Sequence, residues 1–165
     1  MGGDKIINVG LIGFGVVGSG VVELFSQNKN SGVNLKKIAV RDRKKARKLP
    51  FPDVTTNVNE ILEDPDIDII VELIGGYISA KDYIMKAIQN GKHVVTANKA
   101  VLAGYGDELF KIALENKVRM GFEASVCGGI PIIRTITSGL IANRFELLCD
   151  LPGQLKWVMH HKHPV

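Results

Sequence analysis

The sequence has only two cysteines and no long hydrophobic run. Cys127 and Cys149 cannot build a framework of several disulfides, and their scarcity favours a reducing compartment, the cytoplasm. The longest weakly polar stretch, Val9 to Val22, carries five glycines and one serine, so it is too short and too glycine-rich to span a membrane. We see no secretory signal peptide, internal repeat or low-complexity linker. We therefore expect a cytoplasmic protein with no part embedded in a membrane.

Length and composition fit one folded domain with a sizeable core. The chain has 165 residues, of which 45% are hydrophobic and 23% charged, as is ordinary for a globular protein. The net charge is +4, but residues 41–48 hold six basic residues and one acid, and the remainder holds 15 basic and 16 acidic residues. Nucleic-acid grooves spread their charge along a backbone and interleave it with aromatic residues, so this short run favours a local anion site instead.

Short apolar runs alternate with helical patterns along the chain. Strands are expected at Ile6–Ile12, Leu35–Val40, Ile67–Ile74, His93–Thr96 and Val118–Phe122. Helices are expected at Val16–Ser26, Asn57–Glu63, Ser79–Asn90 and Asp107–Asn116, with Asn57 and Ser79 as N-caps and Gly91 just past a helix end. This alternation predicts right-handed crossovers and a doubly wound parallel α/β sheet of the Rossmann-like type.

A glycine-rich hexapeptide joins the first predicted strand to the first predicted helix. It reads Gly13-Phe14-Gly15-Val16-Val17-Gly18, which is the pattern G-x-G-x-x-G. The first glycine permits a tight turn, the second lets a pyrophosphate approach the backbone, and the third lets the helix pack closely on the strand. The free N–H groups of the helix start then face the anion. We interpret residues 13–18 as a dinucleotide phosphate loop, because a structural turn alone would not require this placement.

The end of the second predicted strand decides which nicotinamide cofactor is favoured. An acid there binds the ribose hydroxyl of NAD, whereas an arginine accommodates the 2′-phosphate of NADP. Here the strand leads into Arg41, with Arg43 and Lys44 close behind, and Asp42 is the competing acid. We therefore predict NADP, with NAD as the alternative cofactor; a solvated basic helix start is the other interpretation of this run.

Three further segments, together with the glycine loop, resemble the N-terminal half of homoserine dehydrogenase. They are V-E-L-I-G-G at residues 71–76, V-T-A-N-K-A at 95–100 and F-E-A-S-V-C-G-G-I-P-I-I at 122–133. The resemblance covers about residues 5–146, and its last two segments are the more specific ones. They argue against another semialdehyde reductase or a dihydrodipicolinate-type reductase that shares the nucleotide-binding half. The resemblance implies an oxidoreductase that interconverts L-homoserine and L-aspartate 4-semialdehyde with NAD(P)(H), on the route to threonine and methionine.

The resemblance also assigns site residues. It implies that Lys99 is the catalytic lysine that reaches the reacting oxygen of the substrate. It places the nicotinamide and ribose beside Gly75, Gly76, Thr96, Asn98 and Lys99. It gives a monovalent cation such as sodium to Glu123, Val126 and Gly128. From the residues alone, Lys99 could equally be a solvated lysine at a helix start, and Glu123 could cap the next turn.

The sequence departs from the family after Glu146. We expect residues 4–146 to form the NAD(P)-binding domain and residues 147–165 a divergent tail, with the substrate and dimerisation domain absent. A homo-oligomer would then lack its usual dimerisation domain, and the histidines of the tail would bind metal only adventitiously. Two functions remain open: the cofactor portion of an oxidoreductase acting on a small-molecule substrate, or a non-catalytic NADP-binding module. A nucleic-acid partner is not expected.

Overall fold

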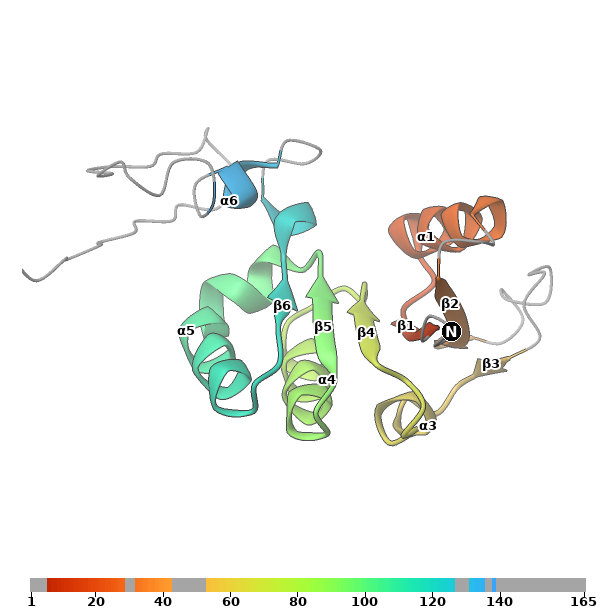
Figure 1. Ribbon diagram of the computed structural model, residues 1–165, viewed down its shortest axis with the longest axis horizontal. Helices are drawn as coiled ribbons and strands as arrows, with labels where there is room; N and C mark the ends of the chain where they lie inside the picture. Colours follow the sequence, from red (N-terminus) through yellow and green to blue (C-terminus); the bar gives the residue numbers. More distant parts are fainter. Residues whose placement is uncertain (1–5, 29–31, 43–52, 127–130, 136–137, 139–165) are drawn as a thin grey trace, which may run out of the picture.

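The computed structural model describes residues 6–28, 32–42, 53–126, 131–135 and 138. Six strands form one sheet in the order β3-β2-β1-β4-β5-β6, and every neighbouring pair is parallel (Figure 1). The strands are β1 (Ile7–Ile12), β2 (Val33–Ala39), β3 (Val54–Thr55), β4 (Ile69–Glu72), β5 (His93–Thr96) and β6 (Met120–Gly121). This order confirms the predicted doubly wound, Rossmann-like α/β fold.

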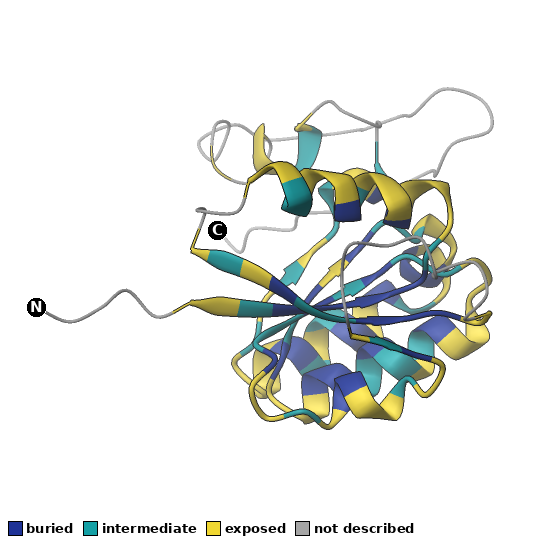
Figure 2. Cartoon of the chain, turned by 90° about the vertical axis from the view of Figure 1, so that its right-hand side faces the viewer, coloured by how far each residue is buried: buried dark blue, intermediate teal, exposed yellow. Residues whose placement is uncertain are grey.

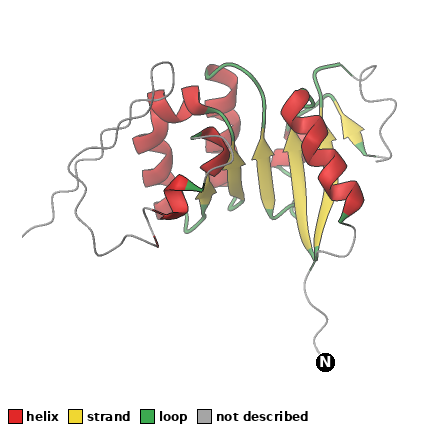
Figure 3. Ribbon diagram, turned by 90° about the horizontal axis from the view of Figure 1, so that it is seen from above, coloured by secondary structure: helices red, strands yellow, loops and turns green. Residues whose placement is uncertain are grey.

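Helices cover the two faces of the sheet unequally. They are α1 (Val16–Gln27), α3 (Asn59–Leu62), α4 (Ile78–Gln89), α5 (Lys99–Glu115), the 3₁₀ turn η1 (Glu123–Ser125) and α6 (Ile132–Arg134). Helix α1 lies over one face, and α3, α4 and α5 pack against the other (Figure 2). Seen from above, α1 crosses the β1–β2 end of the sheet (Figure 3). Within the described residues no helix combines the length and apolarity needed to cross a membrane.

Each face of the sheet has its own hydrophobic core. Leu11, Val22 and Ile38 belong to the core beneath α1. Ile70 and Ile84 belong to the larger core beneath α3, α4 and α5. The strands are rich in β-branched residues, which pack well on a pleated surface that is buried on both sides. Because successive strand residues point to opposite faces, β1, β2 and β4 contribute to both cores, whereas β5 and β6 contribute to the core beneath α3, α4 and α5.

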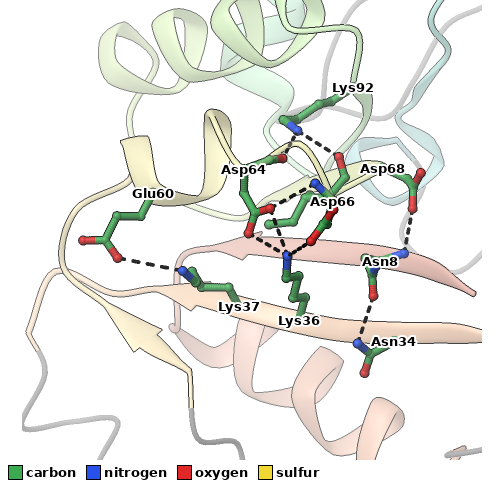
Figure 4. Close-up of polar contacts among 10 residues, drawn as sticks. Asn8, Asn34, Lys36, Lys37, Glu60, Asp64, Asp66, Asp68 and Lys92 are labelled. Atoms are coloured by element: carbon green, nitrogen blue, oxygen red, sulfur yellow. Dashed lines mark hydrogen bonds and ion pairs between the residues drawn. The ribbon is translucent and has the colours of Figure 1, made fainter.

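Lysines and aspartates form a cluster of ion pairs and hydrogen bonds on the side of the sheet where the strands begin. Lys36 Nζ lies 2.9 Å from Asp64 and 3.0 Å from Asp66 (Figure 4). Lys92 is 4% exposed, and its ammonium donates to the carbonyl oxygens of Asp64 at 2.5 Å and Ile67 at 2.8 Å. This cluster ties β2, the segment before β4 and the segment before β5 together. It lies on the opposite side of the sheet from the carboxyl ends of the strands.

Helix α5 begins at Lys99, well before the predicted start at Asp107. Asn98 is its N-cap, and the Asn98 side chain accepts a hydrogen bond from the backbone N–H of Val101 at 3.3 Å. Gly104 and Gly106 then lie inside the helix. Gly104 has open space around the position of a Cβ atom, and Gly106 is buried. The prediction was wrong because a good cap and tertiary packing outweigh the low helix propensity of two glycines.

Two other expectations about helix starts were wrong. Helix α4 begins at Ile78 with Tyr77 as its N-cap, so Ser79 lies inside its first turn. Helix α3 has Val58 as its N-cap, although the side chain of Asn57 accepts a hydrogen bond from the N–H of Asn59 at 3.1 Å. Gly91 does follow α4 with a positive φ of 72°, as is common after a helix end. The predicted tail, residues 147–165, lies outside the described residues.

Candidate nucleotide-binding site

Strands β1 and β4 are neighbours in the sheet although two strands separate them in sequence. The chain order reverses at this point: from β1 the sheet continues to β2 on one side and to β4 on the other. Their ends lie level, because Ile12 pairs with Glu72 and Glu72 pairs with Thr96 of β5. Open α/β sheets bind ligands outside the carboxyl ends of the strands at such a reversal. Most of the predicted site residues follow these strand ends.

Gly13 and Gly18 make the turn from β1 into α1 sterically possible. Gly13 has a φ of +107°, and a Cβ atom there would lie 2.7 Å from the carbonyl oxygen of Leu73. A Cβ atom on Gly18 would collide with the carbonyl oxygen of Gly13. Both positions therefore require glycine, the first for its backbone conformation and contact with the neighbouring strand, the second for helix packing.

Gly15 lies in different surroundings. It is exposed, it is the N-cap of α1, and no heavy atom lies within 4 Å of the position that a Cβ atom would take. The next two residues, Val16 and Val17, are also exposed, Val16 at 92%. The first turn of α1 holds no acidic residue, and no side chain caps it. Its free N–H groups and the positive end of the helix dipole therefore face open space that suits an anion.

The remaining residue of the glycine loop anchors it. Phe14 is half-buried and packs against the core beneath α1. The backbone N–H of Gly13 donates to the carbonyl oxygen of Ala39 at 2.9 Å, so the loop also bonds to the end of β2. Two residues beyond Ala39, Arg41 is exposed, and so is Asp42. The predicted Arg43 and Lys44 lie outside the described residues.

The turn after β4 and the start of α5 form a second wall. Gly75 and Gly76 are exposed, and Gly76 has a φ of +83°. The side-chain amide of Asn98 donates to the carbonyl oxygen of Gly76 at 2.6 Å and to that of Ile74 at 3.2 Å. Lys99 follows as the first residue of α5 and is exposed. Asn98 thus joins the two predicted parts of the nicotinamide wall, with Lys99 at its rim.

Sequence reasoning assigned no role to Glu72, the last residue of β4. Its side chain is fully buried. The carboxylate accepts hydrogen bonds from the backbone N–H of Ile74 at 2.7 Å and from the hydroxyl of Thr96 at 2.6 Å. Burial raises the pKa of Glu72, and hydrogen bonds from Thr96, Ile74 and Asn98 oppose that rise. An acid inside an otherwise apolar strand was the available signal.

Thr96 is equally buried, so the structure places it beneath the site surface. Its hydroxyl donates to Glu72 and accepts a hydrogen bond from the backbone N–H of Asn98 at 3.0 Å. The predicted contact of Thr96 with nicotinamide would therefore have to be made by its backbone or through its neighbours.

The predicted cation ligands lie around η1. The Glu123 carboxylate accepts hydrogen bonds from the N–H groups of Ile133 at 2.9 Å and Arg134 at 3.2 Å, so it caps the start of α6. Val126 follows η1 in an extended conformation, and Gly128 lies outside the described residues. Two N–H donors leave lone pairs free on the carboxylate, and oxygen ligands suit a hard cation. No group of three His, Cys, Asp or Glu side chains that could hold a metal occurs in the described part of the chain.

Comparisons with known proteins agree with this arrangement. The family model described as "Homoserine dehydrogenase, NAD binding domain" matches residues 13–123. The homoserine dehydrogenase of Bacillus subtilis is 44% identical over 156 residues, which are 89% of this chain and 36% of that protein. The chain therefore spans about a third of the length of the curated relatives it matches.

Solved structures extend the comparison to the fold. A homoserine dehydrogenase from Thiobacillus denitrificans is 46% identical, with a TM-score of 0.77 over 84% of this chain and 34% of that one. A hyperthermophilic archaeal homoserine dehydrogenase in complex with NADPH is 28% identical, with a TM-score of 0.65 over 79% of this chain and 47% of that one. The family model covers most of the described fold, including the glycine loop, β4 and the start of α5. The chain therefore belongs to the homoserine dehydrogenase family, and the part matched is the NAD-binding domain of that family.

Proposed function

We propose that the chain forms the cofactor-binding portion of an enzyme that interconverts L-homoserine and L-aspartate 4-semialdehyde with NADP(H), in the cytoplasm. The observation that carries this proposal is the turn at the end of β1. Gly13 and Gly18 are sterically required there, whereas Gly15, the N-cap of α1, has open space where a side chain would lie. A turn with only a structural role would need Gly13 and Gly18 but not Gly15.

Different residues of the chain bind the pyrophosphate and the nicotinamide of the cofactor. The backbone of the glycine loop holds the pyrophosphate at the start of α1, where the helix dipole favours negative charge. Gly75, Gly76 and Asn98 line the nicotinamide end, because they close the adjacent strand ends. When bound, the nicotinamide supplies or accepts the hydride. The absence of a side chain at Gly15 is the feature that fits the pyrophosphate of the cofactor.

Lys99 is the proposed catalytic residue. It begins α5 at the rim of the nicotinamide wall, just past the end of β5, and is exposed. A cation there stabilises negative charge that develops on the substrate oxygen, and it can give or take a proton at that oxygen. Removal of this positive charge by Lys99→Met should lower turnover in a protein that holds the whole active site, while cofactor affinity changes little.

The cofactor preference is proposed to be NADP, because Arg41 follows β2 at the place where the adenosine ribose binds in this fold. The archaeal relative solved with NADPH supports this choice. A charge-assisted hydrogen bond to the 2′-phosphate is worth on the order of 1.5–3 kcal/mol. Asp42, which is also exposed, is the residue that would favour NAD instead.

Fluorescence titration with NADPH and NADH tests both the site and the preference. The native chain should bind NADPH more tightly, and Arg41→Asp should weaken NADPH while leaving NADH close to its native affinity. Arg119→Asp changes the net charge equally at the opposite edge of the sheet and should change neither. Equal affinities in the native chain would contradict the NADP preference, and absence of binding would contradict the site.

A monovalent cation such as sodium is the second proposed ligand. Glu123, Val126 and Gly128 would hold it, the first through its carboxylate and the others through backbone carbonyls. The bound cation would then fix the segment that follows β6 in place beside the cofactor site. In the described residues the Glu123 carboxylate already orders the start of α6, so loss of its charge in Glu123→Gln should weaken sodium-dependent stabilisation.

The alternative function is a non-catalytic NADP-binding module. Homoserine-dependent reduction of NADP, measured at high protein concentration beside cofactor binding, separates the two. Binding without turnover supports the module for this polypeptide, and turnover supports the enzyme.

A further inference from the structure

A fully buried carboxylate lies directly beneath the proposed nicotinamide wall. Glu72 ends β4, and its carboxylate accepts hydrogen bonds from two neutral donors, the backbone N–H of Ile74 in the next turn and the hydroxyl of Thr96 at the end of β5. An ionised carboxylate only accepts hydrogen bonds, and here each of its two oxygens takes one donor.

Thr96 also bonds to Asn98, and Asn98 holds the turn at Gly76 and the start of α5. The N–H of Asn98 bonds to the Thr96 hydroxyl at 3.0 Å, and the Asn98 side chain bonds to the carbonyl oxygen of Gly76 and caps α5. Glu72 therefore lies at the base of a chain of contacts that leads through Asn98 to Gly76 on one side and to Lys99 on the other. Its carboxylate is fully buried and so lies beneath the surface that a cofactor would touch.

We propose that Glu72 is a positioning residue: its ionised carboxylate holds the Gly75–Gly76 turn and the start of α5 in the one arrangement that receives the nicotinamide. This inference rests on the proposed function for its ligand, whereas its contacts are properties of the chain alone. Protonation would put a hydrogen on an oxygen that now accepts one, so the donor to that oxygen, Ile74 or Thr96, must shift or turn its hydrogen away. The wall would loosen although the sheet beneath it stays intact.

Burial and hydrogen bonding set the pKa of Glu72. Its pKa is raised by burial and opposed by hydrogen bonds from Thr96, Ile74 and Asn98, with no contribution from a charged side chain of β1, β5, α4 or α5. Lys99, the charged residue nearest the Asn98 cap in sequence, is exposed. We therefore expect the carboxyl of Glu72 to lose its proton at a higher pH than an ordinary glutamate, without coupling to a second charged side chain.

The first test uses the free, isotope-labelled chain in a magnetic-resonance pH titration. The backbone amide of Ile74 and the side-chain amide of Asn98 should follow one shared transition, with an apparent pKa above that of an ordinary glutamate. Glu72→Gln should abolish this transition, and Glu115→Gln, an exposed glutamate on α5, should leave it unchanged. Separate transitions in the native chain, or a shared one that persists in Glu72→Gln, would overturn the proposal.

The second test compares NADPH with 2′,5′-ADP, which lacks the nicotinamide half. Glu72→Gln should weaken NADPH roughly tenfold or more, as expected for a lost hydrogen bond to a charged group, and leave 2′,5′-ADP unchanged. The NADPH affinity of the native chain should fall as the pH is lowered through the transition. Equal weakening of both ligands would show general loosening and overturn the proposal.

Two results remain: a native chain that binds neither ligand, and a Glu72→Gln variant that does not fold. If the native chain binds neither ligand, the proposed function fails, and the Glu72 inference stands or falls on the titration of Ile74 and Asn98. If Glu72→Gln does not fold, as judged by circular dichroism, the titration of the native chain and the pH dependence of its NADPH affinity decide the question. A flat NADPH affinity through the transition would then overturn the proposal.

Discussion

Gly13 and Gly15 are two residues apart, yet substitution should affect them in opposite ways. Gly13→Ala forces a side chain into a positive φ and toward the carbonyl oxygen of Leu73, which should cost about 1–3 kcal/mol of folding free energy. Gly15→Val meets open space at a negative φ of −91°, so the stability should stay close to native while NADPH binding is lost. Denaturant unfolding and cofactor titration of both variants check this contrast.

The Gly15 half of this prediction identifies the phosphate loop. If Gly15→Val bound NADPH with native affinity, the loop would be only a turn, and the open space above it would serve no ligand.

Asn98 has two roles that different substitutions separate. Asn98→Ala removes the cap of α5 and both bonds to the turn after β4, and should cost at least about 1 kcal/mol of unfolding free energy. Asn98→Asp keeps an oxygen that can cap Val101 but sets a carboxylate against the carbonyl oxygens of Gly76 and Ile74, so it should recover only part of that stability without restoring NADPH affinity. Thermal unfolding and cofactor titration measure the two effects. Equal loss of stability in both variants would contradict the capping role.

The glycines of the loop could be predicted from the sequence better than the residues beneath the proposed site. Glycines 13, 15 and 18 follow from steric rules that hold for any phosphate loop of this type. Glu72 and Thr96 bond to each other across neighbouring strands, and that pairing depends on the register of β4 with β5. No sequence pattern fixes that register, so their role became visible only in three dimensions.

At the scale of whole elements, the lysine and aspartate cluster at the starting edge of the sheet predicts a response to acid. Burial alone would raise the pKa of Asp64, but its hydrogen bonds with Lys36 and with the Asp66 backbone outweigh burial and lower it. A carboxyl whose folded pKa is depressed stabilises the fold above its unfolded value of 3.8, and this contribution is lost as the pH falls through the folded pKa.

Asp64→Asn should therefore flatten the pH dependence of the unfolding free energy in that acid range. At neutral pH it should cost about 1 kcal/mol, because the pair with Lys36 is partly solvated. Asp107→Asn, at an exposed position on α5, is the matched control and should keep the native profile. Urea unfolding from neutral pH to below pH 4 gives the comparison. A native acid response in Asp64→Asn would show that other carboxyl groups cause it.

The predicted bounds of five strands and the starts of α1, α3 and α4 lie within two residues of those observed, whereas β3 and the start of α5 were missed. β5 has its predicted bounds, because its apolar run is short and sharply limited by polar residues. β3 was missed, since a two-residue strand leaves no periodic pattern. The early start of α5 was missed because Asn98 can end a strand or cap a helix with equal ease, and the choice is made by its bonds to Gly76 and Ile74.

At the scale of the whole molecule, we expect a polypeptide of these 165 residues to bind NADPH without measurable oxidation of homoserine. The described residues supply a cofactor side and one lysine, and the matched relatives are about three times as long. Orientation of the substrate beside the cofactor accounts for roughly 7–11 kcal/mol of barrier lowering in well-positioned reactions. Spectrophotometric assay at high protein concentration provides the measurement. Turnover of about 1 per second or faster, within the usual enzyme range, would contradict this expectation.

The central place of β1 has a consequence for synthesis on the ribosome. β1 pairs with β2 on one side, but its other edge waits for β4, and Asn8 bonds to Asp68 across a separation of 60 residues. At roughly 5–20 residues per second, the nascent chain carries an unpaired, apolar strand edge for several seconds. Such an edge is a template for wrong pairing with other chains. Slower translation between Ile12 and Ile69 should thus increase aggregation of this protein more than the same delay after Glu72.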